Sequence, residues 1–188
     1  MRRPRILMAL CPLLLLACST TPERGSAPAA PIAAPASALD KLVDHGRVAV
    51  SAQPTADDLR ALATQGYTHI VSVRTQAEMD DRTTVLFDEP ALAAELGLTY
   101  QLLPIGGDQP FRPEVADGLA LALKDPQAKV LLHCASGGRA SQVYAAYAVK
   151  HLGMDPDTAL RQAEAFGAWP LPLERMTGIR LKVVRAED

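Results

Sequence analysis

The sequence predicts an α/β domain with a mostly parallel sheet of four to five strands flanked by helices. From residue 47 almost to the end of the chain, short β-branched or apolar runs alternate with longer segments that carry helix-capping residues. One run, residues 129–133 (KVLLH), has the continuous apolar centre that is typical of a strand buried on both faces. This alternation favours parallel strands joined by helices on both faces of the sheet.

The first half of the domain supplies two of the expected strands. Residues 47–51 (RVAVS) and 69–73 (HIVSV) are rich in β-branched residues and predict strands. Between them, residues 55–65 predict a helix, because Thr55 can cap it, acidic side chains occupy its first turn and a glycine follows it. The acidic segment that begins at Arg74 is expected to be a loop.

The second half continues the alternation. Residues 90–96 predict a helix that ends at a glycine, and residues 98–103 predict the third strand. A loop rich in Gly and Pro (PIGGDQPFRP) then leads to the fourth strand through a further helix. The remaining helices are expected over residues 113–123, 140–152, 156–166 and 173–184.

Composition and charge restrict the function. The chain has 188 residues, 48% of them hydrophobic and 21% charged, which fits one globular domain with a tail. Without Arg2, Arg3 and Arg5, 16 basic residues face 21 acidic ones, so no nucleic-acid partner is expected. Neither a dinucleotide fingerprint nor a Walker motif occurs, so no cofactor is expected. The histidines lack ligand spacing, so no metal site is expected either.

The N-terminus is typical of a targeting segment. The basic start MRRPR precedes twelve apolar residues, which are too few to cross a bilayer core that needs ~20. The junction Leu-Leu-Ala-Cys18 resembles a bacterial lipoprotein signal, whose cysteine is lipidated; the alternative is an ordinary cleaved signal. Residues 1–18 are then the signal, the Ala/Pro-rich residues 19–38 a tether and residues 39–188 the domain. The resemblance implies a lipid anchor at the bacterial cell envelope, with the domain facing the periplasm or the exterior.

Cys134 is the thiol that remains if Cys11 is removed with the signal and Cys18 is acylated. It follows the predicted fourth strand, and ligands of such sheets bind beyond the carboxyl ends of the strands. A lone thiol in an oxidising compartment needs an explanation. An inert, buried cysteine is one alternative, and a reactive nucleophile is the other.

The residues after Cys134 favour the reactive alternative. Gly137 and Gly138 allow a backbone nest that binds anions, and the following helix N-terminus favours both an oxyanion and a thiolate. Arg139 can clamp two oxygens of a tetrahedral anion, and Ser141 can donate a hydrogen bond to the thiolate. A nucleophile, an anion cradle and a charge clamp are therefore expected within nine residues.

The run HCASGGRAS resembles the HC-x-x-G-x-x-R signature of cysteine-dependent phosphatases of the protein-tyrosine and dual-specificity type. Residues 47–165 are similar to the phosphatase-like domain of bacterial beta-lactamase hydrolase-like proteins. The resemblance implies a cysteine-phosphatase-like fold in which Cys134 is the nucleophile and Arg139 clamps the phosphate. The same resemblance implies that His133 tunes the thiolate, and the alternative is a histidine that is only satisfied at the end of the strand. It also implies an anion cradle made by the backbone of Ala135, Ser136, Gly137, Gly138 and Arg139.

One departure leaves the chemistry open. Four residues separate Cys134 from Arg139, whereas the phosphatase signature has five, and the shorter loop resembles that of the rhodanese sulfurtransferases. Phosphoryl transfer also needs an acid for the leaving oxygen, for which Asp108 is the candidate unless it is an ordinary turn residue. The leading prediction is a phosphatase that forms a phosphocysteine. The alternatives are a sulfurtransferase with a Cys134 persulfide, acting on a sulfur-donor substrate, and a non-catalytic anion-binding module.

Overall fold

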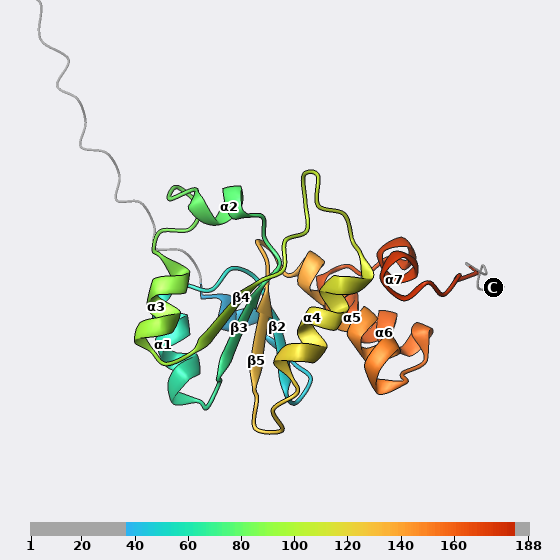
Figure 1. Ribbon diagram of the computed structural model, residues 1–188, viewed down its shortest axis with the longest axis horizontal. Coiled ribbons are helices and arrows are strands. Elements are labelled where there is room, and N and C mark those ends of the chain that lie inside the picture. The colour runs from blue at the N-terminus through green and yellow to red at the C-terminus, as the bar shows by residue number, and fades with distance from the viewer. Residues whose placement is uncertain (1–36, 183–188) are drawn as a thin grey trace, which may run out of the picture. The chain divides into compact units, whose positions relative to one another are not determined.

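The computed structural model describes residues 37–182, and the signal and most of the predicted tether lie outside this range. Five strands form one sheet in the order β1-β2-β5-β3-β4, in which β1 is antiparallel and the other strands are parallel (Figure 1). The α/β fold with a mostly parallel sheet is therefore confirmed. The strands are β1 (Val43–Asp44), β2 (Val48–Ser51), β3 (His69–Ser72), β4 (Thr99–Leu102) and β5 (Val130–His133).

Helices cover both faces of the sheet (Figure 1). Leu131 of β5 packs with α1 and α3 on one face, whereas its neighbour Leu132 packs with α4, α5 and α7 on the other. Alternation along the strand thus divides the interior into two apolar clusters. The helices are η1 (Ala38–Lys41), α1 (Ala56–Thr64), α2 (Gln76–Asp80), α3 (Glu89–Glu95), α4 (Pro113–Ala122), α5 (Gly138–Leu152), α6 (Pro156–Ala163), η2 (Glu164–Phe166) and α7 (Pro170–Thr177).

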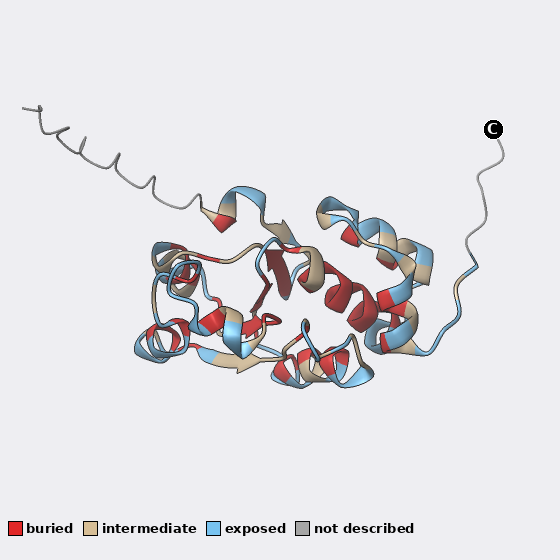
Figure 2. Ribbon diagram, turned by 90° about the horizontal axis from the view of Figure 1, so that it is seen from above, coloured by how far each residue is buried: buried red, intermediate tan, exposed pale blue. Residues whose placement is uncertain are grey.

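The central strand β5 sets the position of the site. It pairs with β2 and β3 in register, so that His133 lies beside Ser51 on one side and Ser72 on the other. The residues that follow these three strands therefore meet at one edge of the sheet. Helix α5 starts directly beyond β5 and is buried from Ala140 to Val149, which makes it the largely red helix near the centre of Figure 2. A buried strand and a buried helix thus hold the connection between them from both ends.

Four elements differ from the sequence-based expectation. Helix α2 occupies part of the expected loop, because Thr75 and Glu78 form a reciprocal capping box. Helix α7 begins three residues before the expected 173–184 and ends at Thr177, because Gly178 adopts a left-handed conformation that stops it. The short elements β1 and η1 were not expected, since two or four residues give no clear periodicity.

The start of the domain also differs by two residues. Ser37 and Ala38 were assigned to the tether, but the Ser37 hydroxyl donates to Asp58 (2.6 Å) and the Ala38 main-chain N–H donates to the same carboxylate (3.0 Å). Ala38 is buried as a result. Asp58 also belongs to the capping box of α1, so one buried carboxylate ties the entering chain to this helix.

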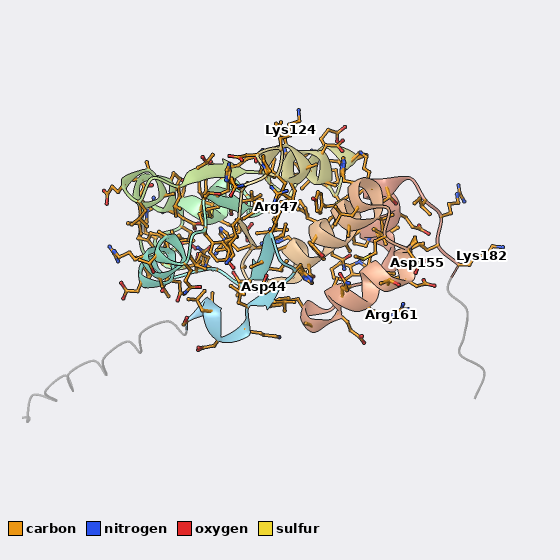
Figure 3. All side chains as sticks on the ribbon, turned by 90° about the horizontal axis from the view of Figure 1, so that it is seen from below. Asp44, Arg47, Lys124, Asp155, Arg161 and Lys182 are labelled. Carbon is orange, nitrogen blue, oxygen red and sulfur yellow. The ribbon has the colours of Figure 1, made fainter. Side chains whose placement is uncertain are left out.

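Exposed charged residues surround the sheet and helices, among them Lys124, Asp155, Arg161 and Lys182, which are labelled in Figure 3. Arg47, labelled in the same view, has a structural role. It donates to the main-chain oxygens of Leu123 (2.9 Å) and Ala128 (3.1 Å) and thereby joins the start of β2 to the turn before β5. None of the helices within residues 37–182 is long and apolar enough to span a membrane.

Candidate active site

Cys134 lies at the carboxyl end of β5, where it is a free thiol with only 1% of its surface exposed. The main-chain N–H of Gly137 donates to its sulfur at 3.2 Å. Ala135 and Ser136, which lie between them in sequence, are exposed. The first N–H groups of α5 have no carbonyl partner within the helix and remain available to an anion. The sulfur is therefore held at the base of a short loop whose outer residues face solvent.

Gly137 cannot be replaced without cost, for two independent reasons. Its φ of +91° is a left-handed conformation that side chains disfavour. A Cβ at this position would also lie 2.2 Å from the ring of Phe166, which packs directly against the loop. At Gly138 the nearest atom to such a Cβ would be the Phe166 carbonyl oxygen at 3.4 Å, an ordinary contact. The loop shape thus depends on Gly137 and on a residue 29 positions later in the chain.

Arg139 is held in place by two elements outside the loop. Its Nη1 and Nη2 donate to the two oxygens of Glu78 at 2.8 and 2.6 Å, and Nη1 also donates to the Ile105 carbonyl. A guanidinium group has five N–H bonds, and these contacts use both bonds of Nη1 and one of Nη2. Among residues 37–182 the Nε–H and the second Nη2–H make no further hydrogen bond of regular geometry, and they lie on the edge of the group near Cys134. Arg139 can therefore grip two oxygens of an anion while Glu78 holds it.

The electrostatics agree with this geometry. Hydrogen bonds from Arg139 lower the pKa of Glu78 to about 2, against the cost of partial burial, so Glu78 is a carboxylate at neutral pH. Conversely, Glu78 raises the pKa of Arg139, and the neighbouring Cys134 adds to this effect. The clamp is permanently charged and lies close to the sulfur.

Asp108 occupies the loop between β4 and α4, whose base reaches the clamp. Ile105 accepts from Arg139, and a Cβ on Gly106 would lie 3.0 Å from Arg139 Nη1. Asp108 itself is exposed at a tight turn that Gly106 and Gln109 close. Within residues 37–182 its carboxylate accepts one hydrogen bond, from Gln109 Nε2 at 3.4 Å. The structure thus brings the loop to the cradle without fixing the carboxylate there, and its role as an acid stays a prediction.

His133 and Ser141 flank the cysteine loop in the sequence, one before it and one after it. His133 is fully buried, and its Nε2 lies 2.7 Å from Oε1 of the equally buried Glu89. The two atoms are close, but neither makes a hydrogen bond of regular geometry. Ser141 donates to the Gly138 carbonyl (2.9 Å), so its hydroxyl points to the loop backbone instead of the sulfur. The predicted roles of both residues toward a thiolate remain predictions.

Four polar residues near the loop were not expected as part of the site. They are Gln53, Arg74, Glu78 and Glu89, which come from three separate segments. Gln53 donates from its main chain to the Ala135 carbonyl at 3.3 Å, and its side chain contacts Arg74 and Glu89. The spacing of Thr75 and Glu78 is a capping-box pattern that could have indicated α2, but no sequence pattern shows which helix faces Arg139.

Two hollows in the surface lie away from this loop. One of about 540 Å³ lies against α4 and α5, and one of about 290 Å³ lies against α2, α3 and β4. No residue from Cys134 to Arg139 lines either of them. The backbone N–H groups of the loop and the charge of Arg139 favour an anion at the exposed mouth of the loop rather than in either hollow. In the described part of the chain, no three His, Cys, Asp or Glu residues gather as metal ligands would.

The central strand β5 of a mostly parallel α/β sheet thus leads through a short loop with Cys134 and Arg139 into the buried helix α5. Residues 37–172 match the family described as the Swiss Army Knife protein DSP-PTPase phosphatase domain. Because the match covers more than half of the chain, the chain belongs to this family and carries a phosphatase domain of the DSP/PTP type.

Individual proteins share part of the sequence or the fold of this chain. A beta-lactamase hydrolase-like protein of Xylella fastidiosa is 32% identical over 106 residues, or 56% of this chain, and the matched part spans 24% of that protein. The crystal structure of Tk-PTP in the active form covers 73% of this chain and 95% of its own, with 21% identity and a TM-score of 0.59. The structure of PTPMT1 in complex with PI(5)P covers 72% and 90%, with 18% identity and a TM-score of 0.60. These structures share the fold.

Proposed function

We propose that this protein hydrolyses phosphoric esters through a phosphocysteine on Cys134. The observation that carries the proposal is the pairing of a buried sulfur, which accepts from the Gly137 N–H, with a clamp that keeps one edge free for an anion. Backbone N–H groups and the free edge of Arg139 would bind the oxygens of the phosphoryl group. They would stabilise the charge that these oxygens carry during transfer.

The reaction has two balanced steps. The Cys134 thiolate attacks phosphorus, an S–P bond forms, the ester P–O bond breaks, and the leaving oxygen takes a proton from Asp108. Water then attacks the phosphocysteine, the S–P bond breaks, and inorganic phosphate and the thiolate are released while the proton returns to Asp108. The exposed turn that carries Asp108 allows this carboxylate to move toward the leaving group.

Sulfur transfer is the second candidate, and the four-residue spacing between Cys134 and Arg139 favours it. In this reaction the thiolate would take a sulfur atom from a donor such as thiosulfate, which leaves as sulfite, and a persulfide would form on Cys134. No acid like Asp108 would be needed. The same cradle would bind the anionic donor.

Mass spectrometry of the intact protein separates the two candidates. The protein is incubated separately with an aryl phosphate and with thiosulfate. Each reaction is quenched in acid, and the mass of the intact protein is measured. A phosphocysteine adduct that is absent from Cys134→Ser supports the phosphatase proposal. A persulfide together with negligible phosphatase turnover would contradict the phosphatase proposal and favour sulfur transfer. If neither reagent forms an adduct, the remaining alternative is a module that binds anions without catalysis.

We further propose that the domain is anchored at the bacterial cell envelope by a lipid on Cys18, which lies outside the described residues. The sequence pattern around this cysteine is the support for the proposal. Cys18→Ala should release the protein from membranes or block its maturation, as cell fractionation would show. An unchanged membrane fraction would refute lipidation at this residue.

A further inference from the structure

We propose that Gln53 is a positioning residue whose side-chain amide joins the His133 side of the anion cradle to the Arg139 side. The inference rests on the proposed function, because it concerns the same cradle. It goes beyond that function by assigning a role to a residue that contacts neither the sulfur nor the free edge of Arg139.

The amide of Gln53 bridges two opposite charges. Its Nε2 donates to Glu89 Oε2 at 2.7 Å, and its Oε1 accepts from Arg74 Nη1 at 2.9 Å. A primary amide can do both at once, since it carries a donor at one end and an acceptor at the other. The main-chain N–H of the same residue donates to Ala135 O of the cysteine loop at 3.3 Å. Gln53 therefore contacts the loop directly and both charged neighbours through its side chain.

On one side, Gln53 holds a fully buried carboxylate. Glu89 has no exposed surface, and its other oxygen lies 2.7 Å from His133 Nε2. A buried carboxylate is costly unless hydrogen bonds and charges compensate it. The bond from Gln53 is the regular hydrogen bond that the Glu89 side chain accepts among the described residues. Losing it would release Glu89 and with it the ring of His133, which directly precedes Cys134.

On the other side, Gln53 holds a buried guanidinium. Arg74 is 5% exposed, and its other side-chain hydrogen bonds, to Glu78 O and Thr84 Oγ1, are longer at 3.5 and 3.4 Å. Its Nε lies 3.8 Å from Glu78 Oε1, the same oxygen that accepts from Arg139 Nη2. A released Arg74 would therefore compete with Arg139 for Glu78. The Gln53 bond keeps the two arginines in separate positions.

A charge swap tests this role. In Gln53→Glu, a carboxylate faces Glu89 and the donor is lost, so we expect the affinity for tungstate, an oxyanion probe measured by calorimetry, to fall roughly tenfold. In the double variant Gln53→Glu with Glu89→Gln, the carboxylate at position 53 faces Arg74. The amide at position 89 lies beside His133 and donates to that carboxylate, which replaces the lost donor. This variant restores the number of charges and the donor–acceptor order, and we expect its tungstate affinity to recover to within about threefold of the wild type.

The matched control is Gln127→Glu, the same change at an exposed residue in the turn before β5, which should leave tungstate affinity unchanged. Circular dichroism and thermal unfolding check that each variant is folded. Should Gln53→Glu fail to fold, Gln53→Asn keeps the amide but is too short for both bonds, and it should also weaken tungstate binding. Wild-type affinity in either variant, or a double variant no better than the single one, would overturn the proposal.

Turnover of an aryl phosphate is measured on the same variants. A wild-type protein that binds tungstate without hydrolysing the ester would contradict the proposed function alone, and the swap would still decide the role of Gln53. A wild-type protein that does not bind tungstate would overturn the inference, because there would be no anion cradle to position.

Discussion

Two loops meet at Arg139, and they differ in how firmly the structure fixes them. In the cysteine loop (residues 134–139) the sulfur is buried, the Gly137 N–H contacts it, and Phe166 packs on the backbone. In the Asp108 loop (residues 104–109) Ile105 contacts the clamp, but Asp108 is exposed and, among the described residues, accepts one hydrogen bond from its neighbour. The surroundings of Cys134 are thus tightly packed, whereas the Asp108 carboxylate has few contacts within the described residues.

This difference matches the demands of the proposed chemistry. An anion cradle stabilises charge only if its donors are already in place, because reorienting them costs free energy. An acid acts once per step and must reach leaving groups of different sizes. Dense packing around Cys134 and sparse contacts around Asp108 are therefore what the proposed mechanism expects, and substitutions in the two loops should have different effects.

The largest effect is expected at Cys134. Cys134→Ser should lower turnover of an aryl phosphate by roughly 10⁴-fold or more, because the serine hydroxyl is nearly isosteric but hardly ionised at neutral pH. Thermal unfolding should change little, since the serine fits the same space. Retention of most of the activity in a folded variant would exclude both covalent mechanisms.

The effect of Asp108→Asn should depend on the substrate. An alkyl phosphate, whose leaving oxygen needs a proton, should react roughly 10²–10⁴-fold more slowly. An aryl phosphate with a weakly basic leaving group should be affected much less. Steady-state rates on both esters check this expectation, and equal insensitivity would remove Asp108 from the site.

The same variant also addresses sulfur transfer. If that reaction is native, Asp108→Asn should leave thiosulfate-to-cyanide transfer nearly unchanged, whereas Arg139→Ala should impair it by removing the anion clamp. Robust sulfur transfer by the wild type with negligible ester hydrolysis would reverse the preferred assignment.

Alanine at a glycine of each loop compares their packing. Gly107→Ala meets only backbone strain, because its φ is +59° and no atom lies within 4 Å of the new Cβ, so it should cost roughly 1–2 kcal/mol in the free energy of unfolding. Gly137→Ala adds a clash with Phe166 to similar strain and should cost roughly 2–5 kcal/mol. Urea denaturation gives both values. Equal losses would contradict the rigid packing of the cysteine loop.

The smallest expected effect concerns the contact that holds Arg139. The pKa of Glu78 is lowered to about 2 from its ordinary value of 4.5, chiefly by hydrogen bonds from Arg139, so this pairing stabilises the folded state above pH 4.5. This contribution should be lost as the pH falls from 4.5 towards 2. The difference in free energy of unfolding between the wild type and Glu78→Gln should therefore shrink over this range. A difference that stays constant from pH 7 to pH 3 would show that Arg139 does not lower the pKa of Glu78.

Much of this architecture follows from the sequence by itself. The apolar centre of residues 129–133 predicted the buried strand β5, and Thr55 with Asp58 predicted the start of α1, because these signals lie within one turn or one strand. The run from His133 to Arg139 predicted the cysteine loop for the same reason. Cys134, the glycines and Arg139 are neighbours in the chain, so their proximity requires only a strand followed by a helix.

The tertiary structure decided which distant residues serve this loop. Glu78 reaches Arg139 across 61 positions, Phe166 packs on Gly137, and Gln53 bridges Arg74 and Glu89. Such contacts depend on which strands are neighbours, because β2, β3 and β5 end at one edge of the sheet and so bring their following segments together. Local propensity and motif spacing act over a few residues and carry no information about strand order. The sequence by itself therefore determined the cysteine loop, and only the fold determined the polar residues that hold it.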